Sequence, residues 1–423
     1  MTPRPPSARP LGLVGAVGIG VGSMLGAGVF VVWGAAAATA GRWLLASVAL
    51  AAVVAVINAA STAQLAALHP VAGGAYAYGG RELGPAWGFV AGLGFVVGKI
   101  ASVAAMSLAI GAYVWPAHAP VVAMVVVACV WALNAKGVTR TAGATTVIAL
   151  VVLAGLAVVI IVSLSTRVES ASGAGTAPVT VMGVASAAAL IFFAFAGYAR
   201  LATLGEEVRD PATTIPRAVA IAVVIVVVVY LVLAAVLLRT PGVALLAGSD
   251  APLMLAVPDM SLWRSGLAAL AAIAAGGALI ALMAGIGRTA MAMARERDLP
   301  RVLGRTSSTG VPQVAEAVAG VAAVALAWWA DLGFALAMSS VSVLTYYAIA
   351  NASAFAARGR VAGFAIPRAI SALGLVLCVA LALSLDRAPI VTSLGVGVVA
   401  VVSREVAMRT RNRRLESRGA PRG

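Results

Sequence analysis

A single lysine, Lys99, lies far from either end of a long apolar stretch that includes GFVVGKIASVAAM. A lysine at the centre of a membrane-spanning helix costs about 2.5–3.5 kcal/mol on insertion scales. The distance to either end of the stretch argues against a side chain that simply reaches back to the aqueous interface. The sequence therefore predicts that Lys99 is a functional residue, whose charge takes the place of a bound cation or which exchanges a proton.

Arg200 is a second charge inside an apolar stretch, and Glu206 and Glu207 follow it closely. Two interpretations stay open for Arg200. Its guanidinium pairs with one of these glutamates as a gate on the inner side, or its side chain snorkels to the aqueous surface. Because Pro211 and Pro216 follow, we expect the two glutamates to lie in a solvated loop and not to perform acid–base chemistry.

Residues suited to catalysis, to a cofactor or to a metal are scattered along the sequence. The two histidines, His69 and His118, fall in predicted loops, and Cys129 and Cys378 lie in separate apolar stretches without a CxxC motif. The run GGAYAYGG lacks the Lys-Ser/Thr that follows a phosphate-binding loop. No nucleophile with a neighbouring base is visible. We therefore expect no enzymatic activity, no cofactor and no metal site.

The composition indicates a membrane protein. The chain has 423 residues, of which 62% are hydrophobic and 10% charged, whereas soluble domains carry about 25% charged residues. The formal net charge of +15 would suggest a nucleic-acid partner in a soluble protein. Here the basic residues lie mostly in predicted loops and the C-terminal tail, so the expected partner is the lipid bilayer and not nucleic acid.

Twelve apolar stretches have about the length that crosses a bilayer. They cover residues 11–39, 43–67, 84–114, 119–136, 143–165, 181–204, 217–238, 266–290, 313–330, 333–356, 366–385 and 388–407. With the N-terminus placed in the cytoplasm, most of the 29 lysines and arginines fall in loops and tails on the inner side. The positive-inside rule thus favours a multi-pass protein of the plasma membrane with both termini cytoplasmic.

The first apolar stretch contains the glycine-rich segment GVGSMLGAGVF, residues 20–30. Gly22 and Gly26 form a GxxxG pattern, which is compatible with simple close packing of two helices. The alternative is a helix that is interrupted within the membrane. Its free backbone amides and carbonyls would then have to line a cavity and bind a polar ligand, because lipid cannot satisfy them.

The sixth stretch provides a possible counterpart, IFFAFAGYARLATLGEEV, with Gly197 among aromatic residues. It lies five stretches after the first. Interrupted helices at positions 1 and 6 are typical of an inverted repeat of five plus five helices with a binding site at the midplane. The sequence predicts an all-α membrane protein of this architecture with two additional helices at the C-terminus.

Four segments resemble the amino acid–polyamine–organocation superfamily. They are GSMLGAGVF (22–30), PVAGGAYAYGGRELGPAWGFVAG (70–92), FFAFAGY with GEEVRDPATTIPRA (192–198 and 205–218), and GRTAMAMARERDLPRVLGR with GVP (287–305 and 310–312). The resemblance implies the leucine-transporter-type fold and amino acid transport by alternating access. It divides the chain into a tail (1–10), two repeats (11–165 and 181–356), two further helices (366–407) and a basic cytoplasmic tail (408–423).

By the same resemblance, the substrate carboxylate would meet the amides of Gly26, Ala27 and Gly28. Its ammonium group would meet carbonyls near Met24 in the first helix and near the sixth-helix break, with Phe193 as an aromatic lid. The sixth-helix residues expected at this site are Phe193, Ala194, Phe195, Ala196 and Gly197. Many relatives carry an acid two residues after the sixth-helix glycine, but here that position is Ala199.

None of the fourteen acidic residues is expected at mid-depth in the helices around this site. A cationic side chain would be unpaired there, so we expect a neutral amino acid as substrate. The expected lining is small and weakly polar: Ser102, Met106, Ser107, Ala275, Gly276, Gly277, Ser339, Ser340 and Ser342.

Sodium coupling is disfavoured because residues 266–287 contain no serine or threonine, whereas ion sites in this fold use hydroxyls of the eighth helix. Proton coupling is expected. An amino acid exchanger, an exporter, a small-amine carrier and a non-transporting sensor of the same fold remain alternatives, and the oligomeric state is left open.

Overall fold

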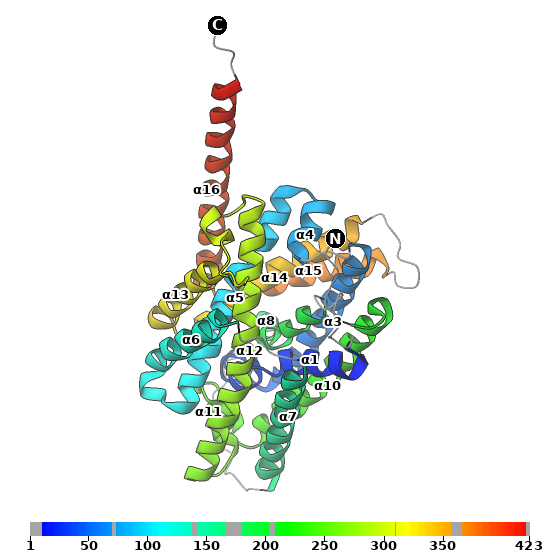
Figure 1. Ribbon diagram of the computed structural model, residues 1–423. Coiled ribbons are helices and arrows are strands. Elements are labelled where there is room, and N and C mark those ends of the chain that lie inside the picture. Colours follow the sequence, from blue (N-terminus) through cyan, green and yellow to red (C-terminus); the bar gives the residue numbers. More distant parts are fainter. Residues whose placement is uncertain are drawn as a thin grey trace.

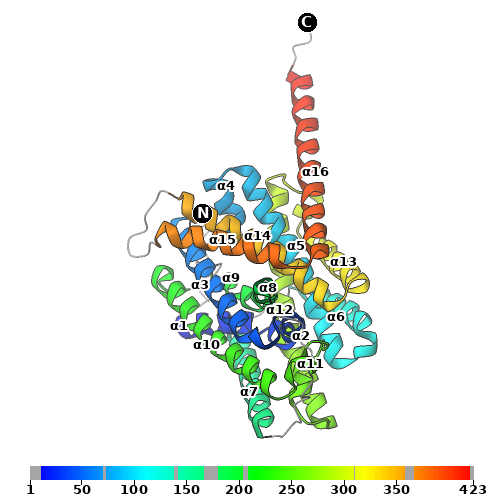
Figure 2. The same ribbon diagram turned by 180° about the vertical axis from the view of Figure 1, so that it is seen from behind.

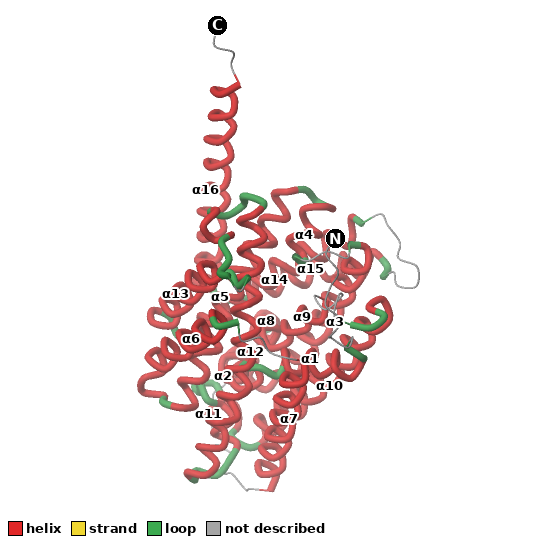
Figure 3. The backbone as a smooth tube through the Cα atoms, in the orientation of Figure 1, coloured by secondary structure: helices red, strands yellow, loops and turns green. Residues whose placement is uncertain are grey.

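The computed structural model describes residues 11–69, 73–137, 142–165, 180–202, 208–308, 310–357 and 366–419. In these residues the regular elements are helices (Figures 1 and 3), and an isolated bridge joins Leu11 to Val208. The N-terminal tail 1–10, the end of the C-terminal tail 420–423, and Glu206 and Glu207 lie outside the described residues.

The longer helices correspond to the predicted stretches. They are α1 (Leu13–Met24), α2 (Gly28–Ala40), α3 (Leu44–Leu68), α5 (Pro85–Val114), α6 (Ala119–Ala135), α7 (Ala142–Ser165), α8 (Val181–Phe195), α10 (Pro211–Arg239), α12 (Ser261–Arg295), α13 (Gln313–Trp329), α14 (Leu332–Ala356), α15 (Arg368–Ser384) and α16 (Arg387–Gly419). The short elements are η1 (Gly41–Trp43), α4 (Ala75–Glu82), η2 (Pro116–His118), η3 (Ala196–Tyr198), α9 (Ala199–Ala202), α11 (Gly242–Leu246), η4 (Pro252–Ala256) and η5 (Arg301–Gly304).

Within the described residues, nine helical segments are long and apolar enough to cross a membrane. The helices α1, α13 and α15 are apolar but shorter. Every one of the twelve predicted stretches contains a helix, and the coarse prediction of an all-helical, multi-pass membrane protein is confirmed. The last helix extends further than expected, since α16 continues to Gly419 through most of the basic tail and projects away from the bundle (Figure 1).

Helix α4 was not predicted, because its glycine-rich sequence is typical of a loop. Gly73 and Gly74 precede it with φ angles of +122° and +56°, a region that favours glycine. Gly80 and Gly88 then let α4 lie directly on α5: a Cβ at Gly88 would be 2.8 Å from the Cα of Gly80. Glycines are typical of a loop, but here Gly80 and Gly88 allow α4 and α5 to lie in close contact.

The centre of the bundle is formed by α5, which packs against α14 and α12, while α14 also packs against α15. On the other side, α2 and α3 pack against α8, and α1 packs against α10 and α7. Figures 1 and 2 show α8 enclosed between these groups of helices. The segments on either side of the two glycine-containing interruptions are thus held inside the protein and away from lipid.

Buried polar side chains connect helices that are distant in sequence. Asn351 on α14 donates to the side-chain oxygen of Asn58 on α3 at 2.6 Å and accepts from Ser61 at 2.7 Å. The thiol of Cys378 on α15 also donates to Asn58 at 3.3 Å. In lipid such groups have no water to pair with, so these mutual bonds fix the contact of α15 with α3 and α14.

An ion pair fixes the segment that follows α12. Asp298 accepts from Nε of Arg404 on α16 at 2.6 Å and from the hydroxyl of Tyr76 on α4 at 2.9 Å. The Arg404 guanidinium also lies 4.9 Å from the centre of the Phe89 ring. The conspicuous ARERDLP run therefore anchors α16 and α4 to the end of α12.

Candidate functional site

The first apolar stretch is interrupted. Helix α1 ends at Met24 and α2 begins at Gly28, so residues 25–27 separate two helical halves. The amide of Leu25 still bonds to the carbonyl of Val21 at 2.8 Å, and the carbonyl of Ala27 accepts from Phe30 at 3.0 Å. Neither half has a side-chain cap at this point. Backbone groups alone, without a capping side chain, thus end α1 and begin α2 at this point.

The interruption leaves backbone donors unpaired. Within the described part of the chain, the amides of Gly26, Ala27 and Gly28 donate to no backbone carbonyl. All three residues are buried. Consecutive unpaired amides at the N-terminus of a helix attract a negative group such as a carboxylate. Binding of a ligand by these amides stays a prediction of the sequence analysis.

The sixth stretch changes its helical form at the corresponding place. Helix α8 ends at Phe195, residues Ala196–Tyr198 form the 3₁₀ turn η3, and α9 follows. The amide of Ala196 bonds to the carbonyls of Phe192 and Phe193. The sixth helix is thus tightened into a 3₁₀ turn, where the prediction expected a simple unwinding.

The two interruptions touch each other. A Cβ at Gly28 would lie 2.6 Å from the Cβ of Ala194, and a Cβ at Gly197 would lie 2.7 Å from the amide nitrogen of Met24. Ala194 and Ala196 are 4% exposed. Any larger side chain at either glycine would push the two segments apart. The glycines are required by this close backbone contact.

Tyr230 on α10 bridges both interruptions, and the sequence analysis missed it. Its hydroxyl donates to the carbonyl of Met24 at 2.8 Å and lies 3.3 Å from the carbonyl of Ala194. The rings of Trp33 and Phe195 pack against the Tyr230 ring, with centroid distances of 5.7 and 4.9 Å. One buried side chain thus lies within hydrogen-bond distance of a carbonyl on each of the two helices.

The first interruption also faces α5 and α12. A Cβ at Gly26 would lie 2.9 Å from the Cβ of Ala278 and 3.7 Å from the Cε of Met106. By contrast, a Cβ at Gly276 would have no neighbour within 4 Å. Ala278 therefore occupies the position beside Gly26 that the sequence analysis expected residues 275–277 to fill.

The serines expected in the lining are largely paired with the protein itself. The hydroxyls of Ser102 and Ser339 are 2.8 Å apart and join α5 to α14. Ser107 donates to the carbonyl of Ala104 at 3.0 Å. Ser340 is buried and its hydroxyl has no partner within the described residues. The hydroxyl of Ser340 therefore remains available to a further ligand.

Lys99 is 9% exposed and lies on α5. Its Nζ is 6.0 Å from the centre of the Phe95 ring, and no ion pair with a described carboxylate is formed. Lys99 and Met106 are two helical turns apart and share one face of α5, about 10 Å apart along the axis. Lys99 therefore lies on the face of α5 that also carries Met106, the residue whose Cε atom approaches the first interruption.

Arg200 lies on α9, directly after the η3 turn, and is partly buried. Its predicted partners Glu206 and Glu207 are outside the described residues, so the proposed gate stays a prediction. Its position on the helical segment adjoining Gly197 agrees with the sequence analysis.

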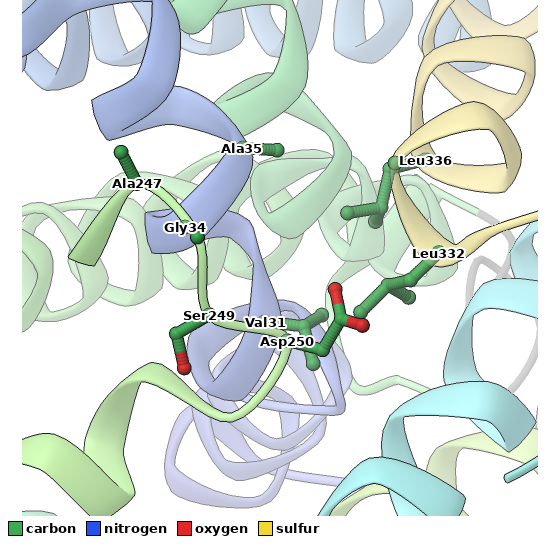
Figure 4. A pocket seen from close by; sticks show the side chains of 10 residues that line it. Val31, Gly34, Ala35, Ala247, Ser249, Asp250, Leu332 and Leu336 are labelled. Carbon is green, nitrogen blue, oxygen red and sulfur yellow. The ribbon is translucent and has the colours of Figure 1, made fainter. Parts of the chain in front are cut away.

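A cavity of about 200 Å³ lies at one end of α2 and α14. Figure 4 shows Val31, Gly34 and Ala35 of α2, Leu332 and Leu336 of α14, and the segment 247–250 around it. Burial raises the pKa of the Asp250 carboxyl, and the charge of Asp331 raises this pKa further. The lining of the cavity is about equally polar and apolar, it carries the single carboxylate of Asp250, and it includes no residue of the contact between the two interruptions.

The model of the amino acid permease family matches residues 15–401. The chain therefore belongs to the amino acid permease family, and it is a multi-pass membrane transporter and not an enzyme.

Several known transporters are similar to the chain. It is 45% identical over 419 residues to an uncharacterized transporter of Mycobacterium tuberculosis, and the alignment covers 95% of this chain and 92% of the relative. It is 26% identical to a branched-chain amino acid permease of Bacillus subtilis, with 69% of this chain and 67% of the relative covered. It is 27% identical to a cationic amino acid transporter of Arabidopsis thaliana chloroplasts, with coverages of 80% and 64%.

The first prediction concerns the contact between the interruptions. Gly28→Ala places a methyl group against Ala194, and overpacking of this kind costs about 1–3 kcal/mol. We expect amino acid uptake in proteoliposomes to fall about tenfold. Gly276→Ala is the matched control, because a methyl group there meets open space. Equal uptake by the two variants would show that the contact is unimportant.

The second prediction concerns Tyr230. Tyr230→Phe leaves the carbonyls of Met24 and Ala194 without this donor, and an unsatisfied buried group costs about 1–3 kcal/mol. Substrate affinity, measured by binding to the purified protein, should fall about tenfold while the protein still folds. Tyr78→Phe is the control, since the Tyr78 hydroxyl has no hydrogen bond in the described residues. A similar loss in both variants would contradict a specific role.

Proposed function

We propose that the protein is a secondary active transporter of neutral amino acids that works by alternating access. The observation that carries this proposal is the direct contact between the interrupted first helix, whose amides at residues 26–28 bond to no described backbone carbonyl, and the 3₁₀ turn of the sixth helix, where Tyr230 lies 3.3 Å from the Ala194 carbonyl. A zwitterion has a carboxylate for the amides and an ammonium group for the carbonyls. Its two charges are neutralised there without a charged side chain.

The substrate pose follows from the two interruptions. The carboxylate binds the amides of Gly26, Ala27 and Gly28. The ammonium group binds carbonyls near Met24, Phe193, Ala194 and Ala196, while Phe193, Phe195 and Gly197 enclose it. The Tyr230 hydroxyl already donates to the carbonyl of Met24 and lies 3.3 Å from the carbonyl of Ala194. Because a carbonyl oxygen has two lone pairs, each can accept a second bond from the ammonium group.

The contacts between helices support an inverted repeat of residues 11–165 and 181–356. Many contacts recur when each helix is exchanged for the one five stretches later. The contact α1–α7 corresponds to α8–α14, α5–α14 corresponds to α12–α7, and α5–α13 corresponds to α12–α6. The contact α5–α6 likewise corresponds to α12–α13. The helices within 366–407 then lie outside the repeat, and alternating access is the motion that this architecture allows.

The placement of carboxylates supports a neutral substrate. Asp250, Asp259, Asp298, Asp331 and Glu296 lie in loops or at helix ends. Among the described residues, no carboxylate contacts the two interruptions. A lysine or arginine substrate would therefore bury an unpaired charge, which costs several kcal/mol. The similar chain from Bacillus subtilis is named for branched-chain amino acids, whereas the Arabidopsis relative is named for cationic ones.

We further propose that transport is coupled to protons through Lys99 and not to sodium. Lys99 is buried and pairs with no carboxylate of the described residues, so releasing its proton removes a charge from the interior. Residues 266–287 of α12 carry no hydroxyl that could coordinate sodium. We also propose a location in the plasma membrane with both termini in the cytoplasm, which the basic residues of the predicted inner loops favour.

The third prediction tests the substrate class. In proteoliposomes with an imposed pH gradient, unlabelled alanine or leucine should inhibit uptake of a neutral amino acid at least about tenfold more strongly than arginine. Omitting sodium should not change the rate. Stronger inhibition by arginine would refute a neutral site. Uptake of small amines that lack a carboxylate would contradict binding by the amides of residues 26–28.

The fourth prediction tests Lys99. Lys99→Met removes the group that is proposed to exchange the proton, so uptake should lose its dependence on pH while counterflow of substrate continues. Lys136→Met is the matched control, because Lys136 is exposed at the end of α6. If folded Lys99→Met protein retained the pH dependence of the wild type, Lys99 would not be the coupling residue.

A further inference from the structure

Glu316 is a buried carboxyl that the transport mechanism does not use. It lies in the first turn of α13 and is 1% exposed. Its Oε2 atom has no hydrogen-bond partner within the described residues. Every other acidic side chain whose burial the structure describes is at least partly exposed to solvent. Glu316 is thus the one carboxyl among them that the helices enclose.

The side chain of Asn134 on α6 faces this carboxyl and has an unpaired acceptor of its own. Asn134 is 4% exposed and its amide nitrogen donates to the carbonyl of Ile280 on α12 at 3.2 Å. The Asn134 side chain interacts with the Glu316 carboxyl, but its Oδ1 has no partner in the described residues. Oε2 of Glu316 and Oδ1 of Asn134 are therefore two buried acceptor atoms of neighbouring side chains that lack a donor in the described residues. The Asn134 side chain and the charge of Arg288 favour the ionised carboxyl, and burial opposes both more strongly.

The backbone closes tightly over the cluster. A Cβ at Gly287 on α12 would lie 2.6 Å from the Cγ of Glu316 and 3.0 Å from the ring of Pro312. The side chain of Gln313 donates to the carbonyl of Ala135 at 3.0 Å, which holds the start of α13 against the end of α6. Glu316 consequently has little room to turn toward water.

The positive charges on the surrounding elements do not form an ion pair with Glu316. Arg288 on α12, Lys136 after α6 and Arg301 on η5 are all exposed. Arg288 attracts the carboxyl from a distance, but the ion pairs in the described chain do not include Glu316. Helix α5 carries only Lys99, and α14 carries no charged residue. The enclosed carboxylate would thus lack a direct counter-ion.

A proton bound to Glu316 removes the buried negative charge that lacks a counter-ion, and it provides the missing donor for the Asn134 side chain. A carboxylate enclosed without a partner is costly, and the neutral form avoids this cost. A protonated carboxyl also becomes a donor through its O–H group. In this cluster the acceptor that lacks a donor is Oδ1 of Asn134.

We propose that Glu316 is a proton-binding site, distinct from Lys99, whose O–H group donates to the Asn134 side chain between α6, α12 and α13. Release of this proton places a negative charge against the backbone of α12 at Gly287 and weakens the contact of α12 with α13. The site thereby couples the packing of these helices to the pH at their end of the bundle. This role does not depend on which substrate is carried.

The first test is chemical labelling of the wild-type protein. Dicyclohexylcarbodiimide, an apolar reagent, reacts with a protonated carboxyl: the proton moves to a carbodiimide nitrogen and the carboxyl oxygen bonds to the central carbon. Mass spectrometry of peptides should locate the adduct on Glu316. Labelling should decline as the pH rises, and a water-soluble carbodiimide should not modify this residue. Absence of the adduct at every pH from about 5 to 9 would overturn the proposal.

The second test measures thermal unfolding against pH. An unfolded glutamate releases its proton near pH 4.3, at about its reference value. A proton held by folded Glu316 above that pH therefore contributes stability that is lost as the pH rises through its release. Glu316→Gln, whose amide replaces the O–H donor, should remove this decline. Glu296→Gln, an exposed residue at the end of α12, should retain it.

The two tests decide the proposal together. An unchanged decline of stability in Glu316→Gln would overturn it, even if transport were normal. If that variant failed to fold, the labelling of the wild-type protein would still decide. Neither measurement requires transport, so failure here and failure of the proposed transport function can be distinguished.

Discussion

The structure depends on one constraint: a backbone inside the bilayer must find its hydrogen-bond partners within the protein or its ligand. The continuous helices meet this constraint by themselves, and residues 196–198 meet it in a 3₁₀ turn, whereas the amides of residues 26–28 bond to no described backbone carbonyl. The molecule places the two interruptions in contact and covers them with α3, α10 and α12. Tyr230 then engages one carbonyl on each side. The amides of Gly26, Ala27 and Gly28 remain for a negatively charged group.

The same constraint explains the small residues. A contact between two backbones needs positions without a side chain, and Gly28 and Gly197 are such positions. Elsewhere Gly98 lets α5 approach Val343 on α14, and the paired hydroxyls of Ser102 and Ser339 connect the same helices. In lipid, close packing and internal hydrogen bonds replace the hydrophobic effect as the forces between helices. The glycines of this chain therefore serve contact more often than flexibility.

Much of this architecture is predictable from the sequence, because the length of an apolar stretch and the distribution of basic residues follow from the bilayer itself. The interruption near Gly26 was also predictable from local glycine content. Tyr230 and Ala278 were not, since only the tertiary arrangement brings α10 and α12 to the interruptions. Helix α4 was missed because Gly80 and Gly88 form a helix contact in a segment whose composition is typical of loops.

The positions of Lys99 and Glu316 show why the binding of a zwitterion and the binding of protons can be separated. The interrupted helices offer partial charges of both signs, so a zwitterion needs no ionised side chain there. A full charge near the two interruptions would favour one end of the substrate over the other. The chain keeps Lys99 and Glu316 apart from that contact, on α5 and at the start of α13. Each group is enclosed by neutral neighbours, so gaining or losing a proton changes its environment far more than it would in water.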